Sequence, residues 1–219
     1  MRSALAFLFD FDNTLFDNDG AERRYAQWID ANVGPGAAER YRRVYEKVRA
    51  ERDYADYLGA VQRIWTEEGR DPRWLGLSEF LIDFPFDECR FAGAREAVRA
   101  ARERGPAWIV SDGEAILQPR KIRRAGLWDA VSGQVMIFVH KENALHEIER
   151  RCPAERYVMI DDKIRVLDAM KRQWSERVCT VFVRQGHYAL DARETGAHPP
   201  ADHAIDAIAA LPALAGALS

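Results

Sequence analysis

Short apolar runs alternate with amphipathic segments over most of the chain, and this alternation predicts the fold. Runs of aliphatic and aromatic residues at 4–9, 107–110, 135–139, 156–160 and 178–183 have the length and composition of buried strands. Segments with apolar residues at helical spacing lie between them, at 93–104, 115–125, 141–151 and 164–174. A closing helix is expected at 204–214, after a short strand near His203. Strands that alternate with helices predict an α/β fold, a parallel sheet with helices on both faces.

Residues 19–83 carry a different pattern, without strand-like alternation. Apolar and aromatic residues recur there every three or four positions, which is typical of helices that pack on one face. Three stripes show this spacing: Tyr25, Trp28, Ile29 and Val33; Tyr41, Val44, Tyr45 and Val48; and Tyr54, Tyr57, Leu58, Val61, Ile64 and Trp65. A shorter helix is expected from Ser78. We therefore predict an all-helical insertion, or cap, of three or four helices at 19–83, and an α/β core formed by residues 1–18 and 84–219.

Composition places the chain among ordinary globular proteins. Of its 219 residues, 47% are hydrophobic and 31% are charged. The formal net charge of −3 argues against non-specific nucleic-acid binding, which depends on an excess of Lys and Arg. No apolar run approaches the roughly 20 residues that span a bilayer, so no membrane partner is expected. Three scattered cysteines favour reduced thiols in a cytoplasmic protein.

Polar side chains follow four of the predicted strands at the point where each strand ends. They are Asp10 and Asp12 after the first strand, Ser111 after the second, Lys141 after the third, and Asp161 and Asp162 after the fourth. Because the carboxyl ends of parallel strands form one edge of the sheet, where ligands bind, these side chains should lie close together. Taken singly, each has another interpretation, such as a turn, a helix cap or a solvated lysine. Their order along the chain favours one shared site.

These residues resemble the motifs of the haloacid dehalogenase superfamily. Asp10-Phe11-Asp12-Asn13-Thr14 fits the pattern DxDx[TV] of motif I. Ser111 in IVSDG is similar to motif II, Lys141 in FVHKEN to motif III, and Asp161-Asp162 in YVMIDDK to the acidic motif IV. Gln118 to Ile122 and Gly126 to Asp129 resemble a further pattern of many members. The resemblance covers nearly the whole chain and implies a Rossmann-like core with a helical cap inserted after motif I.

The resemblance also implies a role for each of these residues in the reaction. Asp10 would attack phosphorus and form an aspartyl-phosphate, while Asp12 would protonate the leaving alcohol and later deprotonate water. Lys141 would offset charge on the nucleophile and the transferring group. Mg²⁺ is the expected cofactor, bound by Asp10, by the backbone carbonyl of Asp12, by Asp161, and by Asp162 directly or through water. The expected substrate-binding residues are Thr14, Ser111, Asp112 and Gly113.

Asp12 narrows the expected reaction within the superfamily. The haloacid dehalogenases lack an acid at this position, because a halide leaving group needs no proton. The resemblance therefore implies a Mg²⁺-dependent phosphatase for a small phosphorylated metabolite, working as a monomer or a homodimer. Two alternatives stay open, a phosphomutase of the same superfamily and a non-catalytic binding or regulatory member.

Two assignments have competing interpretations in the sequence. Lys141 is followed by Glu142, where many members have Pro, so Lys121 is an alternative for the motif III lysine. Lys121, however, fits the pattern around Gln118 better. His187 follows the fifth predicted strand and could reach the same edge of the sheet, although a surface-loop position is the simpler interpretation.

Overall fold

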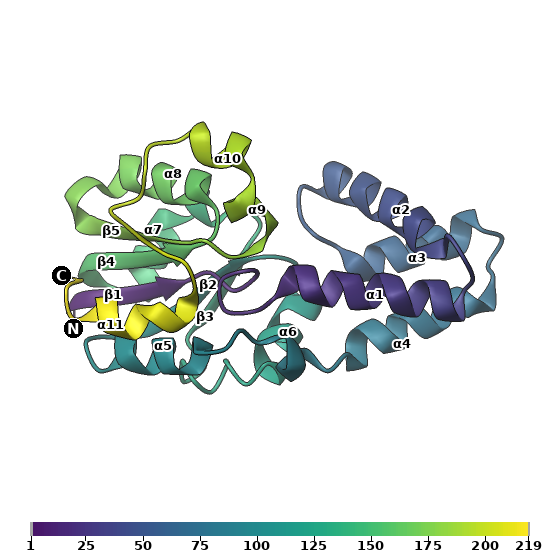
Figure 1. Cartoon of the computed structure of the whole chain (residues 1–219), viewed down its shortest axis with the longest axis horizontal. Helices are drawn as coiled ribbons and strands as arrows, with labels where there is room; N and C mark the ends of the chain where they lie inside the picture. Colours follow the sequence, from purple (N-terminus) through teal and green to yellow (C-terminus); the bar gives the residue numbers. More distant parts are fainter. Residues whose placement is uncertain (1, 219) are drawn as a thin grey trace.

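The computed structural model describes residues 2–218 as a six-stranded sheet flanked by helices, with further helices beyond one end of the sheet (Figure 1). The strands are β1 (Ser3–Phe9), β2 (Ala107–Asp112), β3 (Val135–Phe138), β4 (Ala154–Asp161), β5 (Val178–Val183) and β6 (His203–Ile205). Their order across the sheet is β3-β2-β1-β4-β5-β6, and every neighbouring pair is parallel. The predicted α/β fold with a parallel sheet is confirmed.

Helices cover both faces of the sheet, because side chains of the central strand alternate between two apolar cores. In β1, Phe7 and Phe9 belong to one core and Ala6 and Leu8 to the other. From residue 94 onward the helices are α5 (Ala94–Arg102), α6 (Leu117–Arg124), α7 (Leu145–Arg151), α8 (Ile164–Trp174), α9 (Gly186–Leu190), α10 (Ala192–Gly196) and α11 (Leu211–Ala215). Helices α5 and α11 pack on the first face, and α7 and α8 on the second (Figure 1).

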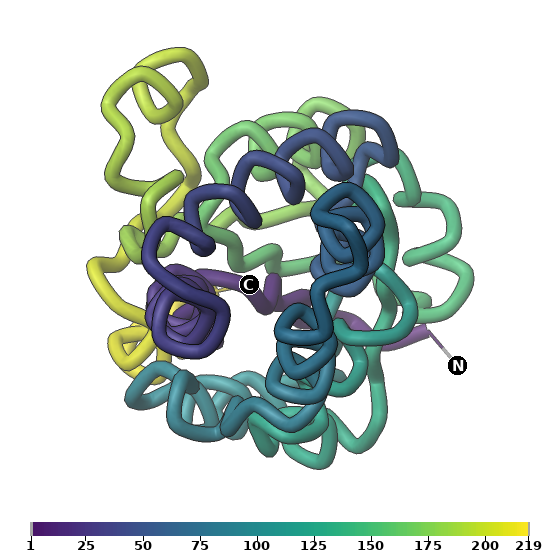
Figure 2. The backbone as a smooth tube through the Cα atoms, turned by 90° about the vertical axis from the view of Figure 1, so that its right-hand side faces the viewer, coloured from purple at the N-terminus to yellow at the C-terminus, as the bar shows by residue number. Residues whose placement is uncertain are grey.

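Four helices follow β1 and lie beyond the carboxyl end of the sheet rather than on its faces (Figures 1 and 2). They are α1 (Asn18–Asn32), α2 (Ala37–Arg52), α3 (Tyr57–Glu67) and α4 (Leu75–Asp83). Asp17 and Asp56 cap α1 and α3, since their carboxylates accept from the N–H groups of Gly20 and Gly59 at 2.7 Å. Most residues of the predicted stripes belong to the core of this helical group, in which Trp74 is completely buried. Tyr54 is the exception and borders a cavity instead.

Short 3₁₀ turns mark several connections, η1 (Pro72–Trp74), η2 (Phe86–Cys89), η3 (Lys141–Asn143), η4 (Ser175–Arg177) and η5 (Ile208–Ala210). None of the helices within residues 2–218 combines the length and hydropathy that a membrane span requires. The boundaries 1–18, 19–83 and 84–219 between a core and a cap stay a prediction.

The short strand predicted near His203 is confirmed as β6, but the prediction of one helix at 204–214 is wrong. Ala204 lies in β6, where it pairs with Phe182 of β5, and the carbonyl of Ile205 accepts from the N–H of Arg184 at 2.9 Å. This pairing buries Ile205 and satisfies backbone groups at the edge of the sheet, so only α11 remains helical after the turn η5.

The helix predicted at 141–151 also begins later than expected. Residues 141–143 form η3, and α7 starts at Leu145. The backbone N–H of Lys141 donates to Oδ1 of Asp112 at 2.8 Å, which holds this residue at the sheet edge, in a 3₁₀ turn instead of an α-helix.

Candidate active site

The chain turns sharply after β1 and so places two carboxylates at the carboxyl end of the sheet. Asp10 continues the strand, because its N–H donates to the carbonyl of Ile160 at 2.9 Å. Asn13 then has a φ of 59°, in the left-handed region that Asn tolerates, and its Nδ2 donates to Oδ1 of Asp19 in α1 at 2.9 Å. This turn leaves Asp10 buried and Asp12 at the border of a cavity.

Lys141 connects the ends of four strands. It follows β3 and is completely buried. Its Nζ contacts Oδ1 of Asp10 after β1 and lies 2.8 Å from Oδ2 of Asp161 at the end of β4. Its backbone is held by Asp112 at the end of β2. The strand ends meet as the sequence predicted, and Lys141 rather than Lys121 is the lysine beside Asp10.

Asp10, Asp161 and Asp162 form a buried carboxylate cluster, in which one oxygen of each residue lies within 4.8 Å of the others. Oδ2 of Asp10 and both carboxylate oxygens of Asp162 are buried without a hydrogen-bond donor among the described residues. The pKa of Asp10 is raised to about 7, because burial raises it by more than the positive charge of Lys141 lowers it. Burial and the neighbouring Asp161 also raise the pKa of Asp162. Oxygen donors with surplus negative charge are suited to a divalent cation.

The Asp12 side chain turns away from this cluster and toward α6. Its Oδ1 accepts from Nζ of Lys121 at 2.6 Å, and its Oδ2 accepts from Nε2 of Gln118 at 2.8 Å. Asp12 therefore has its own partners, separate from those of Asp10. Lys121, the alternative for motif III in the sequence, pairs with Asp12 instead of Asp10.

The other predicted substrate-binding residues surround the same strand ends. Ser111 is buried, and its Oγ accepts from Nε2 of Gln118 at 2.9 Å. Thr14 is completely buried, and its hydroxyl has no partner within residues 2–218. Asp112 and Gly113 border the cavity, while the Asp112 carboxylate also holds the backbone of Lys141. Burial raises the pKa of Asp112 despite the nearby charge of Lys141.

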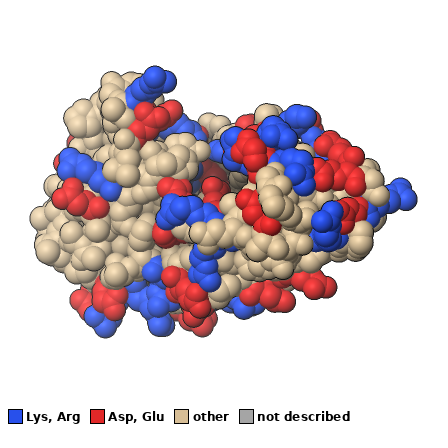
Figure 3. Space-filling model, turned by 45° about the vertical axis from the view of Figure 1, so that its right-hand side comes forward, with Lys and Arg blue, Asp and Glu red and all other residues tan. Residues whose placement is uncertain are grey.

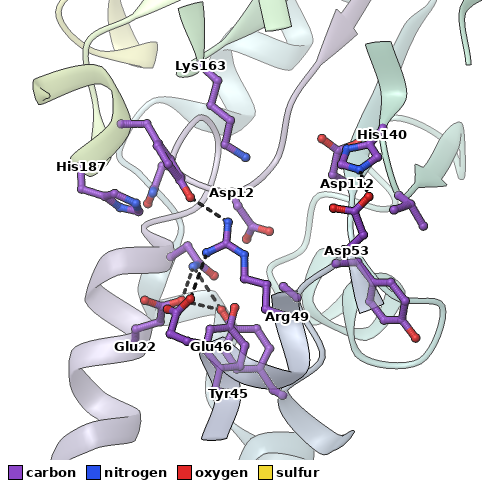
Figure 4. Close-up of a pocket in the computed structure, with 18 of the residues that line it drawn as sticks. Asp12, Glu22, Tyr45, Glu46, Arg49, Asp53, Asp112, His140, Lys163 and His187 are labelled. Carbon is purple, nitrogen blue, oxygen red and sulfur yellow. Dashed lines mark hydrogen bonds and ion pairs between the residues drawn. The ribbon is translucent and has the colours of Figure 1, made fainter. Parts of the chain in front are cut away.

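A cavity of about 190 Å³ lies between these strand ends and the helices α1–α3. In the space-filling view of Figure 3 the surface is hollowed between the sheet with its flanking helices and the helical group α1–α4, and acidic and basic side chains lie at the rim. The helical side contributes Glu22, Tyr45 and Arg49 among others, and the sheet side contributes Lys163 (Figure 4). A ligand in the cavity would therefore contact Asp12. The cavity wall would present both acidic and basic side chains to it.

The sequence model of a haloacid dehalogenase-like hydrolase family matches residues 5–173, a range that includes all the strand-end residues described above. This chain belongs to that family. A haloacid dehalogenase-like hydrolase of known structure from Burkholderia xenovorans is 48% identical, with a TM-score of 0.90, over 96% of this chain and 98% of that chain. Among curated proteins, none matches this sequence.

Two more distant structures share the fold of this haloacid dehalogenase-like hydrolase. L-2-haloacid dehalogenase from Xanthobacter autotrophicus, with chloropropionic acid covalently bound, is 17% identical over 100% of both chains, with a TM-score of 0.65. A HAD-hydrolase from Bacillus subtilis bound to magnesium is 14% identical over 98% of this chain and 99% of that chain, with a TM-score of 0.63. At these identities the likeness concerns the fold alone.

Side chains on the cavity wall of this hydrolase also connect its helical group to the sheet edge. Nη2 of Arg49 in α2 donates to Oη of Tyr188 in α9 at 2.8 Å. Nδ1 of His187 lies 2.7 Å from Oδ1 of Asp19, so His187 does reach the site edge. Burial alone would raise the pKa of Asp19, but hydrogen bonds from Asn13 and His187 outweigh it and lower that pKa. A third contact joins Nε2 of His140 to Oδ2 of Asp53 at 2.7 Å (Figure 4).

The cavity also includes Arg49, Lys163 and Tyr188, which were not predicted from the sequence. Arg49 is one of several arginines on α2, and only the packing of α2 shows that it borders the cavity. Lys163 follows Asp161-Asp162 directly in the sequence, and this position is a signal from which a place at the site could have been predicted. Tyr188 has no comparable signal.

Proposed function

We propose that this chain is a Mg²⁺-dependent phosphatase that hydrolyses a small phosphate monoester through an aspartyl-phosphate on Asp10. The observation that carries the proposal is the second carboxylate, Asp12, which borders the cavity apart from the cluster of Asp10, Asp161 and Asp162. An alcohol that leaves a phosphate ester needs a proton donor, whereas a halide that leaves carbon does not. A carboxyl group at this place favours phosphoryl transfer over dehalogenation.

The residues present fit a magnesium ion. Asp10, Asp161 and Asp162 offer only oxygen ligands, and three of their buried oxygens have no donor in the described chain. Lys141 and Lys163 do not balance three carboxylates, so a divalent cation would remove the excess negative charge. The magnesium-bound structure from Bacillus subtilis, which shares the fold, is consistent with this choice. When bound, Mg²⁺ would supply positive charge against the phosphate oxygens.

In the proposed reaction, a carboxylate oxygen of Asp10 attacks phosphorus while the bond from phosphorus to the ester oxygen breaks. Asp12 gives its proton to that ester oxygen, and the alcohol leaves. Water then attacks the phosphorus of the aspartyl-phosphate, Asp12 takes the proton of the water, and phosphate leaves with Asp10 restored as a carboxylate. Lys141, in contact with Asp10, holds the nucleophile in place and offsets its charge.

The cavity limits the size of the proposed substrate. Its volume is about 190 Å³, and charged side chains such as Glu22, Arg49 and Lys163 line much of it. Such a space suits a phosphate group with a short organic residue. A small phosphorylated metabolite is therefore the proposed substrate class.

Phosphate release from a panel of small phosphate monoesters, measured with Mg²⁺ and with EDTA, tests the proposal. We expect metal-dependent release from one or a few of the esters and no halide release from 2-chloropropionate. Halide release without phosphate release would reject the phosphatase assignment. If folded protein with Mg²⁺ present releases neither phosphate nor halide, the result would contradict a role as a phosphatase or as a dehalogenase.

A further inference from the structure

Lys121 is a buried cation that the proposed chemistry does not yet use. It lies on α6 and is only 1% exposed. Its Nζ donates to Oδ1 of Asp12 at 2.6 Å and to Oδ1 of Asn18 at 2.9 Å. Three aromatic rings surround the ammonium group, with centroids at 5.7 Å for Phe11, 5.2 Å for Phe16 and 5.9 Å for Tyr57. A lysine is seldom buried this completely unless its charge is paired, and here the paired carboxylate is Asp12.

Gln118, one turn earlier on α6, holds the other oxygen of the same carboxylate. Its Nε2 donates to Oδ2 of Asp12 at 2.8 Å and to Oγ of Ser111 at 2.9 Å. Gly113 leaves room for this side chain, because a Cβ there would lie 2.9 Å from Cγ of Gln118. Both oxygens of Asp12 are thus held by donors from one helix, which fixes the orientation of the carboxylate.

The same network extends to the cavity wall on the helical side. Asn18, the first residue of α1, accepts from Lys121 and donates through Nδ2 to Oε1 of Glu22 at 3.1 Å. Oη of Tyr57 in α3 donates to the same oxygen of Glu22 at 2.6 Å. Glu22 and Tyr57 border the cavity. Lys121 therefore connects Asp12 to the wall that an ester's leaving group would face.

We propose that Lys121 is a positioning residue for Asp12, which it holds at the leaving-group side of the cavity with the help of Gln118. The inference rests on the proposed phosphatase function, in which Asp12 protonates the leaving alcohol. A general acid must lie within hydrogen-bond reach of the oxygen that it protonates. A displacement of about 1 Å in such a group costs about 10²-fold in rate. Lys121 acts through Asp12 and does not itself contact the reacting atoms.

The Lys121→Met variant tests this role when two leaving groups are compared. An alkyl phosphate releases a basic alkoxide that needs a proton, whereas p-nitrophenyl phosphate releases a stable phenolate that needs little help. We expect kcat for the alkyl ester to fall about 10²-fold, with kcat for p-nitrophenyl phosphate and both KM values nearly unchanged. Lys121→Arg, which keeps a cationic N–H donor, should recover part of the loss. A merely structural role would lower both kcat values equally, and that result would overturn the inference.

Two further variants control for the loss of a lysine and for a failure of Lys121→Met to fold. Lys47→Met removes an exposed lysine of α2 outside the site and should leave both rates unchanged. If Lys121→Met does not fold, Gln118→Met removes an uncharged donor to the same carboxylate and should show the same selective loss. Equal rates for this variant and the wild type on both esters would contradict the inference.

A crystal structure of the variant separates failure of this inference from failure of the proposed function. If the wild type releases no phosphate from any ester of the panel, the phosphatase proposal fails. The position of Asp12 in Lys121→Met then decides the positioning role by itself. A displaced carboxylate supports it, and a carboxylate that stays in place overturns it.

Discussion

Without the proposed divalent cation, the stability of this protein should depend strongly on pH. In the metal-free protein, burial raises the pKa of Asp10 from 3.8 to about 7, and the pKa of Asp162 is raised as well. Below about pH 4, Asp10 carries its proton in both the folded and the unfolded chain. Between about pH 4 and about pH 7, only the folded chain keeps that proton. The free energy of unfolding should therefore decrease as the pH rises through this window.

The expected effect is large compared with the stability of a typical domain. One proton that is bound only in the folded state changes the free energy of unfolding by about 1.4 kcal/mol per pH unit. Across the window set by Asp10, the loss is on the order of 4 kcal/mol, whereas typical domains are stable by about 5–15 kcal/mol. If Mg²⁺ binds the folded chain as proposed, an excess of it should restore about 2.7 kcal/mol at a concentration of about 100 times Kd.

Urea unfolding, followed by the fluorescence of the six tryptophans, measures this effect in EDTA and in excess Mg²⁺. Asp10→Asn is the matched control, because it removes the titrating carboxyl and keeps the shape of the side chain. Titrating groups that the charge of Asp10 does not influence, such as Asp19, are common to both proteins and cancel in the difference. The raised pKa of Asp162 depends in part on the charge of Asp10, so its contribution belongs to the measured difference. Wild-type and variant curves that stay parallel from about pH 4 to about pH 7 in EDTA would refute the reasoning. Equal stabilisation of both proteins by Mg²⁺ would refute the assignment of Asp10 as a ligand.

Three further substitutions test separate parts of the structure. Asp12→Asn should lower kcat for alkyl phosphates by about 10²–10⁴-fold, measured as phosphate release. It should also lower the urea midpoint, because the buried Lys121 loses its paired carboxylate. Gly186→Ala should cost about 1–3 kcal/mol in urea unfolding, because Gly186 has a φ of 74° and a Cβ there would overlap Cβ of Asn13. Gly196→Ala, with open space around it, is the control and should cost far less. Trp74→Ala should destabilise the protein by about 3–5 kcal/mol, since Trp74 is completely buried, and an unchanged thermal midpoint would contradict the packing described for α1–α4.

The strands were predictable because each one is a short apolar run that the sheet buries. β5 (Val178–Val183) and helix α8 (Ile164–Trp174) have the bounds that the sequence predicted. The meeting of Asp10, Lys141 and Asp161 also followed from the sequence, because the carboxyl ends of parallel strands share one edge. Local pattern failed at 204–214, where pairing of β6 with β5 overrides the helical preference of an Ala-rich segment.

The cavity wall was not predictable, because it depends on how the helices pack. Arg49 and Tyr188 are 139 positions apart in the sequence, and only the fold brings them into contact. His187, for which a surface loop was the simpler interpretation, borders the cavity through its contact with Asp19. The pairing of Lys121 with Asp12 likewise depends on the approach of α6 to the turn after β1, which no local pattern encodes.

The covalent intermediate is the most direct test of the proposed chemistry. Wild-type protein with Mg²⁺ and its best phosphate ester is quenched in acid during turnover, and its peptides are analysed by mass spectrometry. We expect a phosphoryl group on the peptide that contains Asp10, absent from Asp10→Asn and from samples prepared in EDTA. Continued turnover by Asp10→Asn, or wild-type turnover with the phosphoryl group on another residue, would contradict Asp10 as the nucleophile.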